Sequence, residues 1–288
     1  MRLGRLLPRD GTAAGRLLRT PRAVFGLAVL LLVFGCAAGA EWLVPFDTED
    51  MDFDNLLVGP SWPHVLGTDQ LGRDTLSRLV LGSRVALQVS LGAVGLGLLI
   101  GVPLGLISVT IGGRIDDAIM RVMDAIVVFP SLLIAVALAA AIGNSLGTVI
   151  LAIGVANVPW LARIVRAQAL AVRELDFVAA AEAAGTSRLN IMIRHILPNS
   201  IAPVIVQATL GMGYAVLAEA GLGFIGVGVV PPTPTWGNML QAAFPFLEQQ
   251  PVLSVAPGVA IFLLVLAFNL LGDALRDILD PRLRGVVR

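Results

Sequence analysis

The stretch AAAEAAGTSRLNIMIRHILPN, from Ala179 to Asn199, interrupts a chain that is otherwise strongly apolar. Together with the few residues before it, this stretch forms a polar insert. From Arg173 to Arg194 the insert carries six charged side chains: Arg173, Glu174, Asp176, Glu182, Arg188 and Arg194. Burying them at the centre of a bilayer would cost on the order of 15 to 20 kcal/mol, at about 2.5 to 3.5 kcal/mol each. This segment therefore lies outside the membrane core.

The rest of the composition is typical of a membrane protein. The 288 residues are 57% hydrophobic and 14% charged, with a mean hydropathy of +0.87, which lies outside the balance of a water-soluble domain. Stretches without Asp, Glu, Arg or Lys run over Ala23–Ala40, Val85–Gly113, Ala125–Ala162, Ile196–Ala218, Ala220–Leu247 and Gln249–Gly272.

A membrane-spanning helix needs roughly 20 residues, so Ala125–Ala162 is long enough for two, with Gly143–Ser145 as the turn between them. The run Ala220–Leu247 is broken by Gly221, Gly223, Gly226, Gly228 and the PPTP of 231–234, so it is expected to be a loop. The sequence thus predicts an all-α polytopic membrane protein with six transmembrane helices.

The expected organisation follows from these spans. It is a cytoplasmic tail (1–22), a first transmembrane helix (23–44), an extracytoplasmic segment with an amphipathic helix capped by Thr68 or Asp69 (45–84), a five-helix core (85–275) and a cytoplasmic tail (276–288). Within the core, a cytoplasmic loop covers 170–199 and an extracytoplasmic loop covers 226–250. This orientation places 17 of the 20 arginines on the inner side, as the positive-inside rule requires.

The first apolar run has a second interpretation. Arginines precede it and small residues, Ala37–Ala40, end it, which is also the pattern of a cleaved signal peptide or, with Cys36, of a lipoprotein. Its near-spanning length and Trp42, which suits a membrane interface, favour a transmembrane helix.

The polar insert has an internal pattern of its own. The Ala-rich segment from Phe177 to Ala184 favours a short helix that Gly185 can end, and Thr186 or Ser187 can cap another. Alanines at 179, 180, 183 and 184 give the first helix a smooth face that a second protein can approach closely. Pro198, with Asn199 and Ser200 after it, is expected to stop the insert and cap the fifth span. The insert thus has the character of a docking element.

At this point the sequence resembles the permease subunits of ATP-binding cassette importers for dipeptides, oligopeptides and nickel. The family's cytoplasmic signature is Glu-Ala-Ala, three residues, Gly, and about a dozen residues to Leu-Pro. That frame falls here on Ala179-Ala180-Ala181, Gly185 and Leu197-Pro198, with Ala179 where the family has Glu. The literal EAA at Glu182–Ala184 lies too close to Gly185 to fit the frame.

The resemblance extends over about 62–284. It is carried by HVLGTDQLGRDTLSR (64–78), GGRIDDAIMRVMD (112–124) with Phe129-Pro130, LAEAGLGFIGVGVVPPTPTWGNML (217–240) and AFNLLGDALRDILDPRLR (267–284). It implies a type I importer permease fold in the inner membrane of a prokaryote. Its coupling helix would seat on an ATPase subunit through residues that follow the frame: Ala179, Ala180, Ala181, Glu182, Ala183, Gly185, Thr186, Ser187, Arg188, Leu197 and Pro198.

The resemblance also implies the partners. They are a second, similar permease, two ATPase subunits that hold the ATP and Mg²⁺, an extracytoplasmic solute-binding protein and membrane lipid, with no nucleic acid. This chain is expected to bind no cofactor and to have no catalytic residue. Every basic residue is Arg, so a Walker A loop, which needs Lys, is excluded. Peptide is the expected cargo, with nickel or glutathione as alternatives.

Two further motifs have competing interpretations. GLGFIG, at 221–226, matches the dinucleotide-binding pattern, but that pattern needs a strand before it and a helix after it, so we expect packing and turn glycines instead. His64, Asp69 and Asp74 are conceivable metal ligands, yet one histidine with scattered carboxylates is a weak set. Our expectation is therefore no metal site.

Three residues are candidates for the translocation pathway or a gate. Glu219 lies about 30 Å along the fifth span from Ser200, so it is either a gate or a carboxylate satisfied at the outer interface. Asp124 at the inner end of the third span is either a pathway residue or a partner of Arg121 on the same helical face. Asn157 either lines a pathway or packs near Pro159.

Arg163 and Arg166 are expected to anchor at lipid phosphates. A stand-alone secondary transporter is the main rival hypothesis, and it would place ionisable residues in the middle of the bilayer. An intramembrane enzyme would need a buried nucleophile with its base. The spans are nearly free of charge, which disfavours both.

Overall fold

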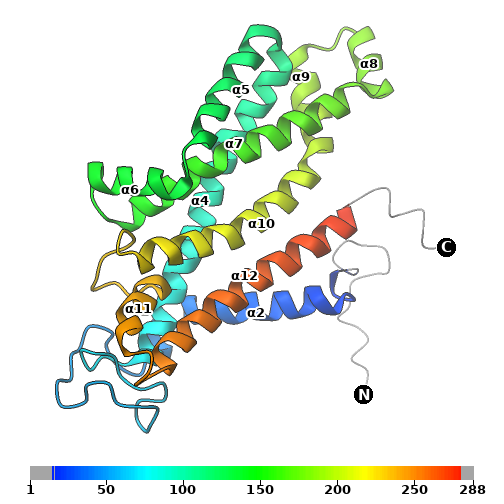
Figure 1. Cartoon of the computed structure of the whole chain (residues 1–288). Helices are drawn as coiled ribbons and strands as arrows, with labels where there is room; N and C mark the ends of the chain where they lie inside the picture. The colour runs from blue at the N-terminus through cyan, green and yellow to red at the C-terminus, as the bar shows by residue number, and fades with distance from the viewer. Residues whose placement is uncertain (1–14, 16, 280–288) are drawn as a thin grey trace, which may run out of the picture.

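The computed structural model describes residue 15 and residues 17–279, and these are almost entirely helical (Figure 1). Within this part of the chain the only β pairing is an isolated bridge between Thr68 and Asp74. The elements are α2 (Pro21–Ala38), α3 (Ala40–Leu43), α4 (Thr75–Ile111), α5 (Gly113–Val128), α6 (Ser131–Ile142), α7 (Leu146–Arg173), α8 (Asp176–Ala183), α9 (Arg188–Ile191), η1 (Met192–Ile196), α10 (Leu197–Phe224), α11 (Trp236–Ala243), η2 (Phe244–Phe246) and α12 (Val252–Leu279). Most of the two expected tails, 1–14, 16 and 280–288, lies outside the described residues.

The described residues contain five or six candidate membrane spans. Five helices are long and apolar enough to span, and α5 with α6 forms a sixth, bent candidate. Helices α4 and α7 run parallel, because Gly92 lies against Ile150 and Gly105 against Val165. The chain must therefore return across the bilayer between them, and α5 with α6 is the segment that does so. The all-α, six-span prediction is confirmed.

The third span differs from the predicted one. It begins at Gly113 instead of Ala125, and it is bent by 85° between α5 and α6. Phe129, which precedes Pro130, is extended, with φ −83° and ψ 125°. A residue before proline avoids the helical region for steric reasons, so Pro130 ends α5 and α6 starts in a new direction. The turn at Gly143–Ser145 is as predicted, and Ser145 also caps α7 by accepting from the Thr148 N–H.

The separate outer amphipathic helix predicted to start near Thr68 or Asp69 is wrong. Helix α4 starts at Thr75 and continues without a break through the second span to Ile111. Its N-cap is Asp74, whose Oδ2 accepts hydrogen bonds of 2.7 Å from both the backbone N–H and the hydroxyl of Ser77. Asp74 therefore satisfies the first free N–H groups of the helix.

The predicted stop at Pro198 is also wrong. Helical structure is continuous from Arg188 to Phe224, and Asn199 and Ser200 bond back to the carbonyls of His195 and Ile196 instead of capping a new helix. In a regular α-helix the ring of Pro198 would clash with the carbonyl four residues earlier. The π-helical turn η1 lies there, and its wider winding leaves room for that ring.

The expected outer loop 226–250 contains a helix that the sequence analysis did not foresee. Helix α11 starts with a capping box, in which the Thr235 hydroxyl accepts from the Asn238 N–H and the Asn238 side chain accepts from the Thr235 N–H. The following residue, Trp236, is buried and donates its indole N–H to the Leu79 carbonyl at 2.9 Å. This loop is thus attached near the N-terminal end of α4.

Glycines allow a close contact between α4 and α7. Gly97, Gly101 and Gly105 recur every four residues on α4 and face α7. A Cβ atom at Gly105 would lie 2.6 Å from the Ala162 carbonyl oxygen, and one at Gly101 would lie 3.0 Å from the Val158 carbonyl oxygen. Such small-residue rows let helix backbones approach closely in a bilayer, where packing replaces the hydrophobic effect.

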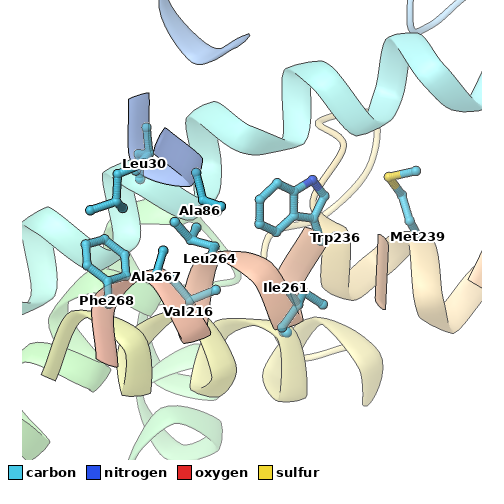
Figure 2. Packing of buried hydrophobic residues seen from close by; sticks show 12 residues of the cluster. Leu30, Ala86, Val216, Trp236, Met239, Ile261, Leu264, Ala267 and Phe268 are labelled. Atoms are coloured by element: carbon cyan, nitrogen blue, oxygen red, sulfur yellow. The ribbon is translucent and has the colours of Figure 1, made fainter. Parts of the chain in front are cut away.

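A second packed region joins α2, α4, α10, α11 and α12 (Figure 2). It contains Leu30 of α2, Ala86 of α4, Val216 of α10 and Leu264 of α12, all buried, with Trp236 of α11 beside them. Gly26 of α2 lies against the Ala267 carbonyl. Helix α2 is thus a packed part of the bundle, as the transmembrane interpretation of the first apolar run predicted.

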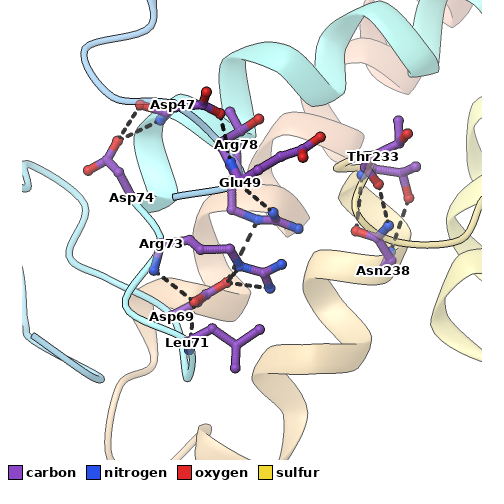
Figure 3. Close-up of polar contacts among 12 residues, drawn as sticks. Asp47, Glu49, Asp69, Leu71, Arg73, Asp74, Arg78, Thr233 and Asn238 are labelled. Atoms are coloured by element: carbon purple, nitrogen blue, oxygen red, sulfur yellow. Dashed lines mark hydrogen bonds and ion pairs between the residues drawn. The ribbon is translucent and has the colours of Figure 1, made fainter. Parts of the chain in front are cut away.

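Residues 44–74 form a segment without a long helix that has a buried polar interior (Figure 3). Asp69 accepts from the Arg73 guanidinium at 2.7 Å, and Arg78 donates to the Thr48 carbonyl at 3.0 Å. Arg73 and Arg78 are both less than a tenth exposed. These contacts fix the segment on the first turns of α4.

The glycine contact generates a matched test of the fold. Gly105→Ala places a methyl group against a backbone oxygen that cannot rotate away, so we expect a loss of about 1 to 3 kcal/mol in unfolding free energy. The change is measured as a lower thermal midpoint of the purified protein in detergent. Gly95→Ala is the control, because Gly95 lies on the exposed face of α4 with open space around it. Equal midpoints for the two variants would contradict this account of the contact.

Candidate functional site

The predicted docking element is a helical tip that projects from the end of the bundle (Figure 1). Helix α8 covers Asp176–Ala183 and is followed by Gly185 with φ +79°, a conformation that favours glycine. Ser187 then caps α9 by accepting from the Asn190 N–H. The short helix, its glycine stop and the second cap are all as predicted.

One side of this tip is packed and the other is exposed. Val178 is fully buried, in a cluster with Val172 of α7 and Ile191 of α9. The exposed side, which we name the coupling surface, consists of Phe177, Ala179, Ala180, Glu182, Ala183, Gly185, Arg188 and Leu189. Phe177 is 42% exposed and Leu189 59% exposed. Apolar side chains on a charged segment that cannot enter lipid are typical of a protein contact.

The remaining residues of the predicted coupling set lie around the base of the tip. Ala181 and Thr186 are half-buried, and the Thr186 N–H donates to the Ala181 carbonyl, which closes the turn after α8. Leu197 packs in the cluster that holds Val178, and Pro198 is exposed one residue later. The structure therefore brings together 179–188, with Leu197 and Pro198 in the helix that supports them.

A hollow of about 470 Å³ lies between the bend of the third span and helices α7 and α10. Polar and aromatic side chains from all three helices line it: Ser131 from the start of α6, Asn157 and Trp160 from α7, and Gln207 and Tyr214 from α10. Ser131 and Tyr214 hydrogen-bond across it at 3.0 Å. Trp160 and Tyr214 are about half exposed, so the hollow is open to one side of this chain.

The three candidate pathway residues occupy different environments. Asn157 lines the hollow and also packs against Gly97 and Gly211, so both interpretations describe part of its position. Asp124 is 65% exposed and pairs with Arg163 at 2.6 Å, instead of with Arg121. Glu219 is 1% exposed, and its buried Oε1 has no hydrogen-bond partner among the described residues. It faces the junction of α10 and α11 and does not line the hollow.

The two arginines expected at lipid phosphates instead form ion pairs between helices. Arg163 bonds Asp124, and Arg166 bonds both carboxylate oxygens of Asp116 at 2.7 and 2.6 Å. All four side chains connect α5 with α7. The sequence contained a signal for the partners, since α5 contains acids and α7 contains arginines, but their pairing needed the geometry.

The possible metal ligands and the GLGFIG segment both take part in contacts within the fold. The His64 ring lies 2.9 Å from Asp74, which caps α4, while Asp69 is occupied by Arg73. Among residues 17–279 no three His, Cys, Asp or Glu side chains gather as metal ligands. Residues 221–226 form the last turn of α10 and the bend after it, with no strand before them. This is not the strand–turn–helix context of a dinucleotide site.

Comparisons with known proteins match nearly the whole chain. Residues 96–285 match the family described as binding-protein-dependent transport system inner membrane component, and residues 11–60 match the N-terminal TM domain of oligopeptide transport permease C. The chain belongs to this family of transport permeases. Membership implies work with an ATPase and a solute-binding protein, and it makes the chain an inner membrane component of an importer.

Two relatives show how similar this permease is to its family. The dipeptide transport system permease protein DppC of Alkalihalophilus pseudofirmus is 43% identical over 263 residues, which cover 91% of this chain and 86% of that protein. The glutathione transport system permease protein GsiD of Pectobacterium atrosepticum is 40% identical over 271 residues, which cover 94% and 90%.

A solved structure shares the fold of the permease. A chain of the MetNI methionine ABC transporter, in inward facing conformations, superposes with a TM-score of 0.58 at 19% identity. The match covers 70% of this permease and 97% of that chain. At this identity the likeness concerns the fold alone, and it supports the type I importer architecture predicted from the sequence.

The buried attachment of the tip can be tested separately from docking. Val178→Ala removes two methyl groups from a fully buried position, so we expect about 1 to 3 kcal/mol of local destabilisation and faster amide hydrogen exchange over 176–191. The exposed Ala180→Ser change in the same helix is the control and should leave exchange unchanged. If Val178→Ala also left the exchange rates unchanged, the tip would not depend on this contact.

Proposed function

We propose that the permease forms half of a translocation pathway for di- or oligopeptides and that an ATPase drives it through the coupling surface. A second, similar permease supplies the other half. Two ATPase subunits, which hold the ATP and Mg²⁺, dock at the cytoplasmic side, and a solute-binding protein delivers cargo from outside. The observation that carries the proposal is the exposed apolar tip, held at the end of the bundle by a buried anchor.

The hollow supports the assignment of the pathway. It is bounded by three helices of this chain but open on one side, as expected where a second permease completes the wall. Its lining mixes amide, hydroxyl and aromatic groups. Peptides present backbone amides and varied side chains, so neutral hydrogen-bonding groups beside aromatic rings suit them without selecting one sequence.

The proposed mechanism is mechanical. Closure of the ATPases on ATP moves the tip, and α9, η1 and α10 transmit that motion because helical structure is continuous from Arg188 to Phe224. Helix α10 lines the hollow through Gln207 and Tyr214, so its displacement changes access to the cargo. The coupling requires that the docked tip contact the ATPase differently in its two states.

The orientation is part of the proposal. With the N-terminus, the C-terminus and the tip in the cytoplasm, most arginines lie inside, in agreement with the positive-inside rule. The C-terminal ends of α4 and α7 lie beside each other. Helix α8 follows α7, so the tip lies on the same side of the membrane as the connection between α4 and α5. The outer segment 44–74 and α11 then face the solute-binding protein.

Peptide is the cargo that the curated relatives favour most directly. Relatives at about 40% identity include permeases named for dipeptide and for glutathione transport, and glutathione is itself a tripeptide. Nickel is the weaker alternative, since the hollow presents no cluster of metal-binding side chains. Uptake assays with labelled dipeptide, glutathione and nickel distinguish the three.

A matched pair of glycine variants tests the coupling. Gly185 and Gly143 both have φ near +80 to +90° with open space around them, so valine strains either turn by roughly 1 to 3 kcal/mol. Gly185 lies on the coupling surface, whereas Gly143 lies between α6 and α7 at the other end of α7. We expect Gly185→Val to abolish ATP-dependent uptake while ATP hydrolysis continues, and Gly143→Val to leave uptake within about twofold.

Both variants are measured in proteoliposomes that contain the second permease, the ATPases and the binding protein. Membrane insertion is checked by recovery of the folded complex. Normal uptake by Gly185→Val would contradict the assignment of the coupling surface. Uptake by the unaltered chain without any ATPase would instead support a stand-alone transporter.

A further inference from the structure

Helix α5 is attached to the bundle by unusually little packing. Of its sixteen residues, Met123 alone is buried, against Val158 and Ala162 of α7. Ile119, Met120 and Ile126 are only partly buried beside this anchor. Two ion pairs with α7 add to this apolar packing and fix how α5 is oriented.

The two ion pairs act at different levels along α5. The Asp116 carboxylate accepts from Nε and Nη2 of Arg166 at 2.7 and 2.6 Å, and this forked geometry fixes orientation as well as distance. Asp124 Oδ1 accepts from Nη2 of Arg163 at 2.6 Å. The two acids are eight positions apart, which corresponds to about 12 Å of helix. Met123 and the two pairs thus hold α5 at three points.

This attachment sets the position of one wall of the hollow. Ile126, Val127, Phe129 and Pro130 follow Asp124 within two turns, and all four line the hollow. The facing wall contains Trp160 of α7, three residues before Arg163. The Asp124–Arg163 pair therefore joins the two walls next to the hollow, and the Asp116–Arg166 pair holds the same two helices further along.

We infer that Asp116, Asp124, Arg163 and Arg166 are positioning residues for transport, because their two interhelical ion pairs hold the bend of the third span against α7 and so set the width of the hollow. The inference rests on the proposed function, in which the hollow is half of the pathway. None of the four side chains lines the hollow, so each acts through the helix that it holds.

Charge reversal in the assembled importer tests the inference. Asp116→Arg and Arg166→Asp are each made alone and then together, and dipeptide uptake and ATP hydrolysis are measured in proteoliposomes. Each single reversal leaves two like charges in contact, so we expect at least about a tenfold loss of uptake. The double reversal restores an ion pair, and we expect uptake within about threefold of the unaltered complex.

A second readout reports the hollow itself. Phe129 is 62% exposed and lines the hollow, so Phe129→Cys in a Cys36→Ser background can be labelled with a water-soluble maleimide. We expect the labelling rate to change in each single reversal and to return in the double reversal. Asp124→Asn provides a milder variant, because its exposed side chain is not needed for folding, and it should change the labelling rate in the same direction.

Glu41→Gln is the matched control. It removes one partner of the Arg84–Glu41 ion pair, which joins other parts of the chain and in which Glu41 is 75% exposed, so uptake and labelling should stay unchanged. The inference is overturned if the single reversals leave uptake and labelling unchanged. It is equally overturned if the double reversal assembles but remains as defective as the single ones.

The same experiment separates this inference from the proposed function. If the unaltered complex takes up no dipeptide, glutathione or nickel, the proposed function fails, and the labelling rates still decide whether the ion pairs position α5. If the unaltered complex transports dipeptide and the reversals change neither readout, the inference alone fails.

Discussion

The close contact between α4 and α7 is the constraint on which the rest of the structure depends. Gly97, Gly101 and Gly105 leave no room for a side chain between the two helices. In a bilayer the hydrophobic effect does not drive helices together, so close backbone packing has to supply the attraction. Because α4 and α7 are parallel, this contact also forces the intervening segment to cross back, which makes α5 and α6 one bent span.

The bent span connects the scaffold with the hollow. Pro130 turns the chain by 85°, and the residues around the bend form one wall of the hollow, while α7 and α10 form the others. The tip that carries the coupling surface is attached to the same two helices, at the end of α7 and before α10. A motion of the tip therefore acts on two walls of the hollow, and the ion pairs of Asp116 and Asp124 tie the third wall to α7.

Much of this could be predicted from the sequence, and the failures have physical causes. The charge-free runs predicted the spans, and the alanine run with Gly185 predicted α8, because these depend on local composition. Pro198 was misjudged because a π-helical turn accommodates it. The row Gly97, Gly101 and Gly105 was overlooked, although its spacing of four is a known packing signal. Partners such as Arg166 and Asp116 are 50 residues apart, and only the fold brings them together.

The account treats the chain as a passive bundle moved by a separate motor, and one measurement tests this most directly. The permease is reconstituted with its second permease and binding protein, with and without the ATPase subunits, and the accumulation of labelled dipeptide is followed after ATP is added. We predict accumulation only when both the ATPases and ATP are present. Accumulation of dipeptide in vesicles that lack the ATPases would contradict the account.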